Sequence, residues 1–356
     1  MKHKLKKLLS KRPYRKAEPE KSLEEAIHNL PRITNETVAE HREEVLSSAR
    51  KYIYPLQHSL HRIVVISAGI FVVLVVGFFV YCILSLYKFD STSTFIYRVT
   101  QVIPFPVAKA GPHWVSYENY LFELRHYIHY YQTQQKVDFT SASGKQQLDA
   151  FRKVALKQVV DQAYVKQLAD QHKVSVSDKE LKDEVALLRN QNRLGGSDEV
   201  FQDVLHEFWG WSLDDFNREL KSQILAQKVV STMDVATHAR AQNVLTQLTN
   251  GGDFAAIAKA TSDDLSTKDA GGDYGVAIDK NNRDLSPQVV DALFKLTQVG
   301  QFSGIIETPQ GLEIVKVREV DGSTVRASHI FFQFKNINTY VDPIKQKEKP
   351  RNFISS

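Results

Sequence analysis

Two stretches near the C-terminus carry side chains that could do acid–base or hydrogen-bonding chemistry together. The apolar stretch 312–317 contains the carboxylate of Glu313, and the apolar stretch 325–332 contains the imidazole of His329. An Asp-Gly pair at 321–322 lies between them and supplies the positive φ angles that hairpin turns demand. The two stretches are therefore predicted to pair as an antiparallel hairpin.

The turn of this hairpin decides which side chains face each other. A three-residue loop from Val320 to Gly322 places His329 directly across from Glu313, roughly 5 Å apart on one face of the sheet. A two-residue Asp-Gly turn instead places His329 opposite Ile314. Only the first register is expected to make His329 and Glu313 partners.

A series of short motifs precedes the hairpin and runs into it. In order they read GDFAAIA at 252–258, TSDD at 261–264, GGDYG at 271–275, LFKL at 293–296 with VGQFS at 299–303, and TPQGLEIVKV at 308–317. This order and spacing resemble the parvulin family of peptidyl-prolyl cis-trans isomerases over about residues 240–318. The resemblance implies an α+β class and an FKBP-like fold, in which helices surround an antiparallel sheet.

One family motif is out of its usual place. Parvulins begin with a strand of the form raSHIL ahead of the first helix, but residues 234–242 run straight into that helix here. The matching sequence, VRASHIFF, comes after the last family motif, within 325–333. Either a second repeat begins there and is cut short, or the domain is circularly permuted. Only 24 residues follow Phe332, so we favour permutation, with 325–333 as an inner strand beside the last one.

The resemblance also implies the residues of an active groove. His329 matches the first-strand histidine, Asp264 the Cys/Asp position and Thr308 the loop threonine, whereas the second family histidine is replaced by Glu313. The positions that hold the proline ring are Tyr274, Leu285, Val289 and Phe294. Val289 stands where the family usually has phenylalanine. Because Glu313 and Val289 depart from the family pattern, an alternative function stays open, namely a chaperone that binds peptide in the same groove without turnover.

The chemistry implied by the resemblance requires no metal, cofactor or covalent intermediate. Rotation about an X–Pro bond has a barrier of about 20 kcal/mol, because the planar amide is stabilised by resonance. An enzyme can favour the twisted amide by holding the proline ring in an apolar pocket and by biasing hydrogen bonds at the carbonyl and nitrogen. The single cysteine, Cys82, can form neither an intrachain disulfide nor a four-ligand zinc site.

A mostly helical region is predicted ahead of these motifs, over residues 107–235. Short strands and a turn lead into a helix that Ser116 caps, and Ser177 with Glu180 forms a capping box at a later helix. Their order resembles the N-terminal chaperone domain of SurA/PrsA-type folding factors. That resemblance implies unfolded or newly exported polypeptides with X-Pro bonds as partners.

A membrane segment is predicted still earlier in the chain. Ile63–Tyr87 holds 25 residues without a charge, and roughly 20 helical residues cross a bilayer. Residues 1–62 hold 14 Lys/Arg against 8 Asp/Glu, so the positive-inside rule places the N-terminus in the cytoplasm and 88–356 outside. The remaining chain is close to neutral, which does not support a nucleic-acid-binding face.

The predicted protein is thus a membrane-anchored, extracytoplasmic isomerase and folding chaperone for exported proteins, with the lipid bilayer as a second partner. Its predicted parts are a cytoplasmic basic tail at 1–62, a transmembrane helix at 63–87, an extended linker at 88–106, a SurA-like helical domain at 107–235, a parvulin-like domain at 236–334 whose first strand is 325–333, and a flexible tail at 335–356.

Overall fold

The computed structural model describes residues 33–53, 56–190 and 197–354, and it divides into two units, with the boundary between Val80 and Tyr81. The first unit contains helix α2 (Asn35–Ile53) and most of helix α3 (Leu56–Tyr87). Within α3, the stretch Arg62–Tyr87 is long and apolar enough to cross a membrane, by length and composition. This stretch coincides with the predicted membrane span.

The basic stretch before residue 33, and the Gly195-Gly196 pair at which the sequence predicts the end of a helical stretch, lie outside the described residues.

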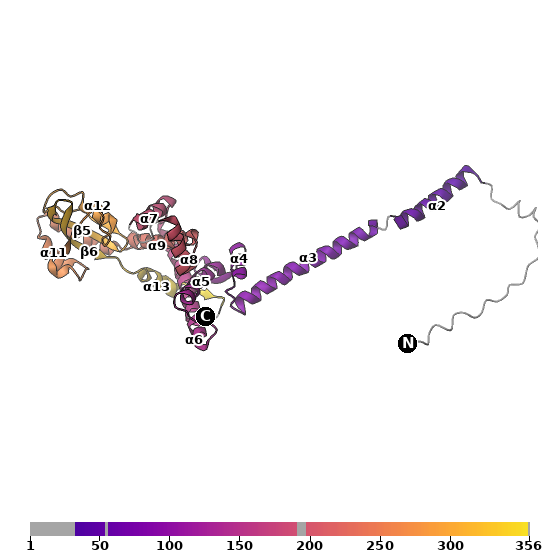
Figure 1. The fold of residues 1–356 in the computed structure, drawn as a ribbon, viewed down its shortest axis with the longest axis horizontal. Helices are drawn as coiled ribbons and strands as arrows, with labels where there is room; N and C mark the ends of the chain where they lie inside the picture. The colour runs from indigo at the N-terminus through magenta and orange to yellow at the C-terminus, as the bar shows by residue number, and fades with distance from the viewer. Residues whose placement is uncertain (1–32, 54–55, 191–196, 355–356) are drawn as a thin grey trace, which may run out of the picture. The chain divides into compact units, whose positions relative to one another are not determined.

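The second unit contains a helical domain and a sheet domain (Figure 1). The helical domain begins with the last residues of α3, and its core gathers buried residues from Cys82 to Val229 together with Val341. Its elements are α4 (Thr94–Val102), β1 (Pro106–Ala110), β2 (His113–Ser116), α5 (Tyr117–Thr133), α6 (Ala142–His172), α7 (Asp178–Asn190), α8 (Asp198–Trp209), α9 (Leu213–Met233), α13 (Asn338–Lys347) and β7 (Arg351–Asn352).

Local sequence signals explain where several of these helices begin. The Ser116 hydroxyl accepts a hydrogen bond from the Asn119 amide at 3.1 Å, as predicted. At α7, the Ser177 amide donates to the Glu180 carboxylate at 2.8 Å, while the Glu180 amide donates to the Ser177 hydroxyl at 3.2 Å. This reciprocal pair is the predicted capping box.

The segment 88–106 is not the extended linker that its Ser, Thr and Pro content suggested. It contains α4, which Ser93 caps by accepting a hydrogen bond from the Ile96 amide at 3.3 Å. Ile96 and Thr100 lie four residues apart on one face of α4 and are buried in the helical core. The serine that looked like linker composition is a helix cap, a role serine fills especially well.

The C-terminal segment is not the flexible tail that was expected for 335–356. Residues 338–347 form α13, whose Val341 is fully buried, and β7 pairs with β1 through Ala108–Asn352 and Lys109–Arg351. The chain therefore returns to the helical domain after completing the sheet domain. Its last two residues lie outside the described ranges.

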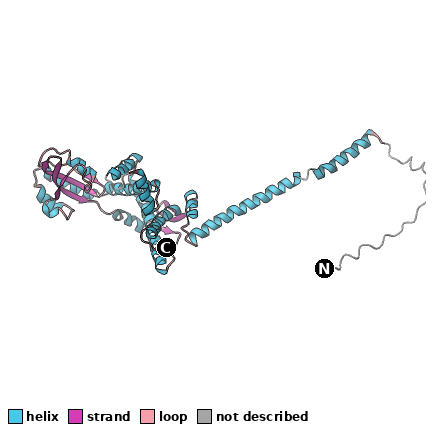
Figure 2. Cartoon of the chain, viewed as in Figure 1, coloured by secondary structure: helices cyan, strands magenta, loops and turns pink. Residues whose placement is uncertain are grey.

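The sheet domain is a four-stranded antiparallel sheet with helices on both faces, and Figure 2 shows its strands in magenta. Residues alternate between the two faces along β5. Ile314 packs in one core cluster with residues of α10 and α11, and Val315 packs in another with residues of α12. The elements are α10 (Val235–Thr249), α11 (Phe254–Thr261), η1 (Lys268–Ala270), β3 (Asp273–Ile278), α12 (Pro287–Leu293), β4 (Ile306–Thr308), β5 (Gly311–Asp321) and β6 (Thr324–Gln333).

The strand that carries His329 is an inner strand of this sheet. The strand order is β3-β6-β5-β4, and β6 is antiparallel to β5. The segment 325–333 therefore folds back between β3 and β5, which is the arrangement that a circular permutation predicts.

Neither predicted register of the hairpin is correct. The turn has two residues, Gly322 and Ser323, so that Asp321 pairs with Thr324, and His329 pairs with Val315. A bulge at Arg318 shifts the register between Val317 and Glu319. A bulge inserts one unpaired residue into one strand, and short-range turn rules do not predict where it falls.

Candidate functional site

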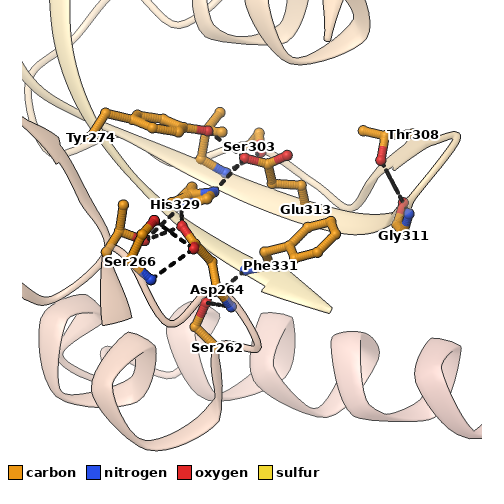
Figure 3. Close-up of polar contacts among 12 residues, drawn as sticks. Ser262, Asp264, Ser266, Tyr274, Ser303, Thr308, Gly311, Glu313, His329 and Phe331 are labelled. Atoms are coloured by element: carbon orange, nitrogen blue, oxygen red, sulfur yellow. Dashed lines mark hydrogen bonds and ion pairs between the residues drawn. The ribbon is translucent and has the colours of Figure 1, made fainter. Parts of the chain in front are cut away.

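His329 lies between two carboxylates at the centre of the sheet domain (Figure 3). Its Nδ1 is 2.6 Å from Oε1 of Glu313, and its Nε2 is 2.9 Å from Oδ2 of Asp264. Glu313 is the diagonal neighbour of His329 on the same face, because the directly opposed residue is Val315. Diagonal neighbours lie roughly 7–8 Å apart at the backbone, a gap that two long side chains can close. The predicted partnership is therefore present, although the predicted register is not.

The two carboxylates favour the protonated form of His329. Burial alone would lower the pKa of His329, but the hydrogen bonds and charges of Glu313 and Asp264 outweigh burial and raise it. Only 6% of His329 and 7% of Glu313 is exposed. A buried imidazolium flanked by two carboxylates leaves the cluster with a net negative charge when both carboxylates are ionised.

Asp264 reaches the site from the loop after α11, where its own carboxylate organises the turn. Its Oδ1 accepts hydrogen bonds from the Ser266 amide at 2.9 Å and from the Ser266 hydroxyl at 2.6 Å. Burial favours the protonated acid, yet these bonds and those from Thr267 and His329 hold the pKa of Asp264 well below its usual value. Asp264 therefore serves both as a turn residue and as a partner of the imidazole.

Thr267 belongs to the cluster but was not predicted. Its hydroxyl is 2.6 Å from Oδ2 of Asp264 and 2.8 Å from Nε2 of His329, so it bridges the two. The motif TSDD ends three residues earlier, and only the turn that Asp264 builds brings Thr267 back to the ring. A sequence signal exists in hindsight, since an Asp side chain commonly bonds the backbone two residues on and so folds the chain into a turn.

Tyr274 is part of the hydrogen-bonded cluster rather than a free pocket wall. Its hydroxyl donates to Oε1 of Glu313, and its ring stacks on His329 with the ring centres 4.2 Å apart. Burial and the charge of Glu313 both raise the pKa of Tyr274, so the phenol keeps its proton and donates it. The chain of contacts thus runs from Asp264 through His329 and Glu313 to Tyr274.

Thr308 lies apart from the cluster, as Figure 3 shows. Its hydroxyl donates to the Gly311 carbonyl at 3.0 Å and accepts from the Gly311 amide at 3.2 Å. These bonds close the turn between β4 and β5. Thr308 therefore stabilises the hairpin that carries Glu313, and the structure gives it no contact with His329.

The four residues assigned to the proline pocket do gather in one place. Tyr274, Leu285 and Phe294 are half-buried and pack against the apolar cluster that contains Val289. Val289 itself is only 1% exposed, so it forms the floor of this region rather than a wall open to a ligand. Valine is smaller than the phenylalanine that is usual at this position, and Tyr274, Leu285 and Phe294 pack against the cluster that contains it.

The loop that carries Asp264 is locked against β6 by a glycine. The His329 amide donates to the Gly272 carbonyl at 2.8 Å, and Gly272 has a φ of +82°. A Cβ at this position would lie 2.0 Å from the His329 carbonyl oxygen. Glycine is therefore required for this close approach, which sets the distance between the acidic loop and the imidazole.

Comparisons with known proteins identify both domains. Residues 57–230 match the family described as the SurA-like N-terminal domain, and residues 224–319 match the PPIC-type peptidyl-prolyl isomerase domain. The second match ends before β6, the strand that carries His329.

Three curated relatives are foldase proteins. Foldase protein PrsA 2 of Bacillus cereus is 26% identical over 166 residues, which cover 41% of this chain and 55% of the relative. Foldase protein PrsA of Caldanaerobacter subterraneus is 27% identical over 196 residues, 51% of this chain and 61% of the relative.

Foldase protein PrsA of Pediococcus pentosaceus is 31% identical over 103 residues, 29% of this chain and 34% of the relative. The matches thus span between 34% and 61% of the relatives' own lengths. The chain carries a SurA-like N-terminal domain followed by a PPIC-type peptidyl-prolyl isomerase domain of the parvulin family, and its relatives are PrsA foldase proteins.

Proposed function

We propose that the chain is a peptidyl-prolyl cis-trans isomerase and folding chaperone for exported polypeptides, held at the outer face of a membrane by α3. The observation that carries the proposal is the position of β6. Although β6 comes after the segment that matches the isomerase family, it supplies the inner strand of the sheet and sets His329 between Asp264 and Glu313.

The charge of this cluster suits the twisted amide. A planar X–Pro amide carries negative charge on its oxygen, and rotation about the C–N bond removes that charge separation. Asp264 and Glu313 with one imidazolium between them give a net negative site, which disfavours the charge-separated planar form when the carbonyl oxygen faces it. Differential stabilisation of the twisted form is what lowers the rotation barrier.

Asp264 is the member of the cluster that meets the substrate in this proposal. Its side chain is 23% exposed, against 8% for the side chain of His329 and 10% for that of Glu313. The two buried residues are positioning residues, because they hold and orient the acidic loop from behind. Tyr274, Leu285 and Phe294 would contact the proline ring at their exposed edges.

A second function, peptide binding without turnover, is favoured by a different observation. Both nitrogens of His329 are engaged by carboxylates, and the pocket floor at Val289 is almost fully covered. A cluster this well satisfied resists rearrangement, since each broken bond leaves a buried charge unpaired. In that case the groove would bind X-Pro segments and the helical domain would hold unfolded clients.

The two functions separate in one assay series on the full chain in detergent. Isomerisation of a short X-Pro peptide should run above the uncatalysed rate, and Asp264→Ala should lower kcat/KM at least tenfold. Asp263→Ala is the matched control, because Asp263 pairs with Arg240 and not with His329. A rate at background for the unaltered chain, with aggregation of an unfolded client still suppressed, would leave only the holdase function.

The membrane orientation is tested separately. The N-terminus is proposed to lie in the cytoplasm and residues 88–356 outside, because positive charge concentrates before the span. Protease added to intact spheroplasts should degrade the second unit while a tag at residue 1 survives. Protection of the second unit would contradict this topology.

A further inference from the structure

The helical domain begins on α3 itself, without a free linker. Cys82, Ser85 and Leu86 of the last two turns are buried within it. The Tyr87 hydroxyl donates to the Pro106 carbonyl at 2.6 Å, and the Tyr117 hydroxyl donates to the Leu86 carbonyl at 2.6 Å.

The outer boundary of the hydrocarbon layer falls at these same turns, if α3 is the anchor proposed above. A helix rises about 1.5 Å per residue, so roughly 20 residues cross a layer of about 30 Å. Counted from Ile63, the first residue after Arg62, the layer ends near Tyr81 and Cys82. The helical domain therefore starts at the level of the lipid headgroups.

Helix α4 presents an apolar face beside this level. Arg98 and Val102 follow Phe95 by three and seven residues. The three side chains therefore share one face of the helix, opposite the buried Thr100. Phe95 is 56% exposed and Val102 is 83% exposed. The ring of Phe95 lies 6.4 Å, centre to centre, from the ring of Tyr81, the residue at which the boundary falls.

Exposed apolar side chains are concentrated in this part of the second unit. Among its described residues, sixteen large hydrophobic side chains are exposed, and six of them lie between residues 81 and 102. They are Tyr81, Ile83, Leu84, Phe89, Phe95 and Val102. The others are scattered from 114 to 320, so exposed apolar residues are densest between the end of α3 and the end of α4.

We propose that α4 lies in the headgroup region of the outer leaflet, with Phe95 and Val102 inserted among the lipids, so that the helical domain is docked on the membrane surface. The bilayer is the occupant that the positions favour, because the apolar group is continuous with the anchor and is bordered by the exposed cations Lys88 and Arg98. Aromatic side chains and cations are typical of this interface. The inference rests on the proposed membrane anchor and is independent of turnover.

A depth measurement on the full chain tests this docking. Val102→Cys is labelled with an environment-sensitive NBD fluorophore, and the chain is reconstituted in phosphatidylcholine–phosphatidylglycerol vesicles that contain a shallow spin-labelled lipid. Val299→Cys is the matched control, since Val299 is 65% exposed and lies in the sheet domain. The chain without an introduced cysteine gives the background of NBD labelling, because its one cysteine, Cys82, is buried.

The expected result is at least twofold stronger quenching at position 102 than at 299, with blue-shifted emission. Phe95→Glu in the chain labelled at 102 should reduce that quenching by at least half. Because Phe95 is largely exposed, this change leaves the core intact. Equal quenching at 102 and 299 would overturn the inference.

Alkaline carbonate extraction and the isomerase assay distinguish this result from failure of the proposals on which it rests. A chain that stays in the membrane pellet while position 102 is unquenched would refute docking and leave the anchor standing. A chain released by carbonate would refute the anchor, and docking with it. Isomerase activity reports on the sheet domain alone and is expected to be the same in the Val102→Cys and Val299→Cys chains.

Discussion

The helical domain and the sheet domain treat buried carboxylates in opposite ways. In the helical domain, Glu123 is 4% exposed, and its carboxylate accepts a hydrogen bond from the neutral amide of Gln162 at 3.1 Å. Burial raises the pKa of Glu123 to about 7, so its charge is not secured. In the sheet domain, Glu313 and Asp264 share an imidazolium whose pKa is raised. The difference shows that the buried carboxylate of Glu313 has a charged partner, whereas that of Glu123 has a neutral one.

The two domains also differ in how their chains are assembled. The sheet domain is a continuous stretch from α10 to β6, whereas the helical domain needs α13 and β7 from the far side of that stretch. The sheet domain should therefore keep its fold when the C-terminal segment is lost, and the helical domain should not. The predictions below test this contrast, from the largest expected effect to the smallest.

Removal of residues 336–356 should destabilise the helical domain by on the order of 3–7 kcal/mol. Full burial of a valine such as Val341 contributes about 1.5–3 kcal/mol. Asp161, Tyr164 and Gln167 each lose a polar partner worth about 0.5–1.5 kcal/mol. The truncation keeps Lys335, whose amide binds Asp234. Hydrogen exchange should rise throughout α6 and stay unchanged in β5; equal protection in both would refute the contrast.

Substitution of the central imidazole should destabilise the sheet domain by about 3–5 kcal/mol, because His329→Ala leaves buried carboxylates without their counterion. Urea unfolding of the full chain, followed by exchange in β6, measures this loss. His238→Ala is the control: its ring makes one 3.0 Å hydrogen bond to the Ser231 carbonyl, worth about 0.5–1.5 kcal/mol. Similar losses in the two variants would argue against a charged cluster.

Substitution of Gly272, which lies where the loop that carries Asp264 packs against β6, should cause a smaller loss of stability. Gly272→Ala combines a positive φ with a Cβ 2.0 Å from the His329 carbonyl oxygen, and strain of this kind amounts to about 1–3 kcal/mol. Gly304→Ala meets no atom within 4 Å and should change stability by less than about 0.5 kcal/mol. Thermal unfolding of both variants checks the pair, and a neutral Gly272→Ala would show that the loop is not seated on β6.

The smallest expected effect is the change in the free energy of unfolding with each pH unit. His329 has a raised pKa, so its contribution is complete below the unfolded value near 6.5 and is lost as pH rises through the folded value. The free energy of unfolding should fall by up to about 1.4 kcal/mol per pH unit in that window. Measurements well above pH 7 avoid the titration of Glu123, whose pKa is raised to about 7. Glu313→Gln should flatten the slope, and an unchanged slope would exclude His329 as its source.

The sequence was most informative where chemistry depends on short motifs. The capping box of Ser177 and Glu180 and the return of 325–333 as an inner strand follow from a local pattern and from the family resemblance. The partnership of His329 and Glu313 was expected too, although from a register that the hairpin does not adopt. These features share one property: each is decided by residues close together in sequence or by a motif with a fixed place in the sheet.

The features that were missed depend on distant packing or on a single inserted residue. The bulge at Arg318 changed the register, and nothing about an arginine in a strand signals a bulge. Residues 337–354 looked polar and flexible because their partners, such as Tyr164 and Ala108, lie about 180 or more residues earlier. Helix α4 was hidden by a serine cap that resembles linker composition. Tertiary packing overrode composition in each case.

The ionisation state of His329 tests the central claim most directly. Nitrogen-15 NMR of the histidine-labelled full chain in detergent, assigned by the signals lost in His329→Gln, reports whether each ring nitrogen carries a proton. An imidazole held between Asp264 and Glu313 should be mostly doubly protonated at pH 6.5, because its midpoint lies above the ordinary value near 6.5. A midpoint at or below 6.5 would mean that β6 does not bring the imidazole between the two acids.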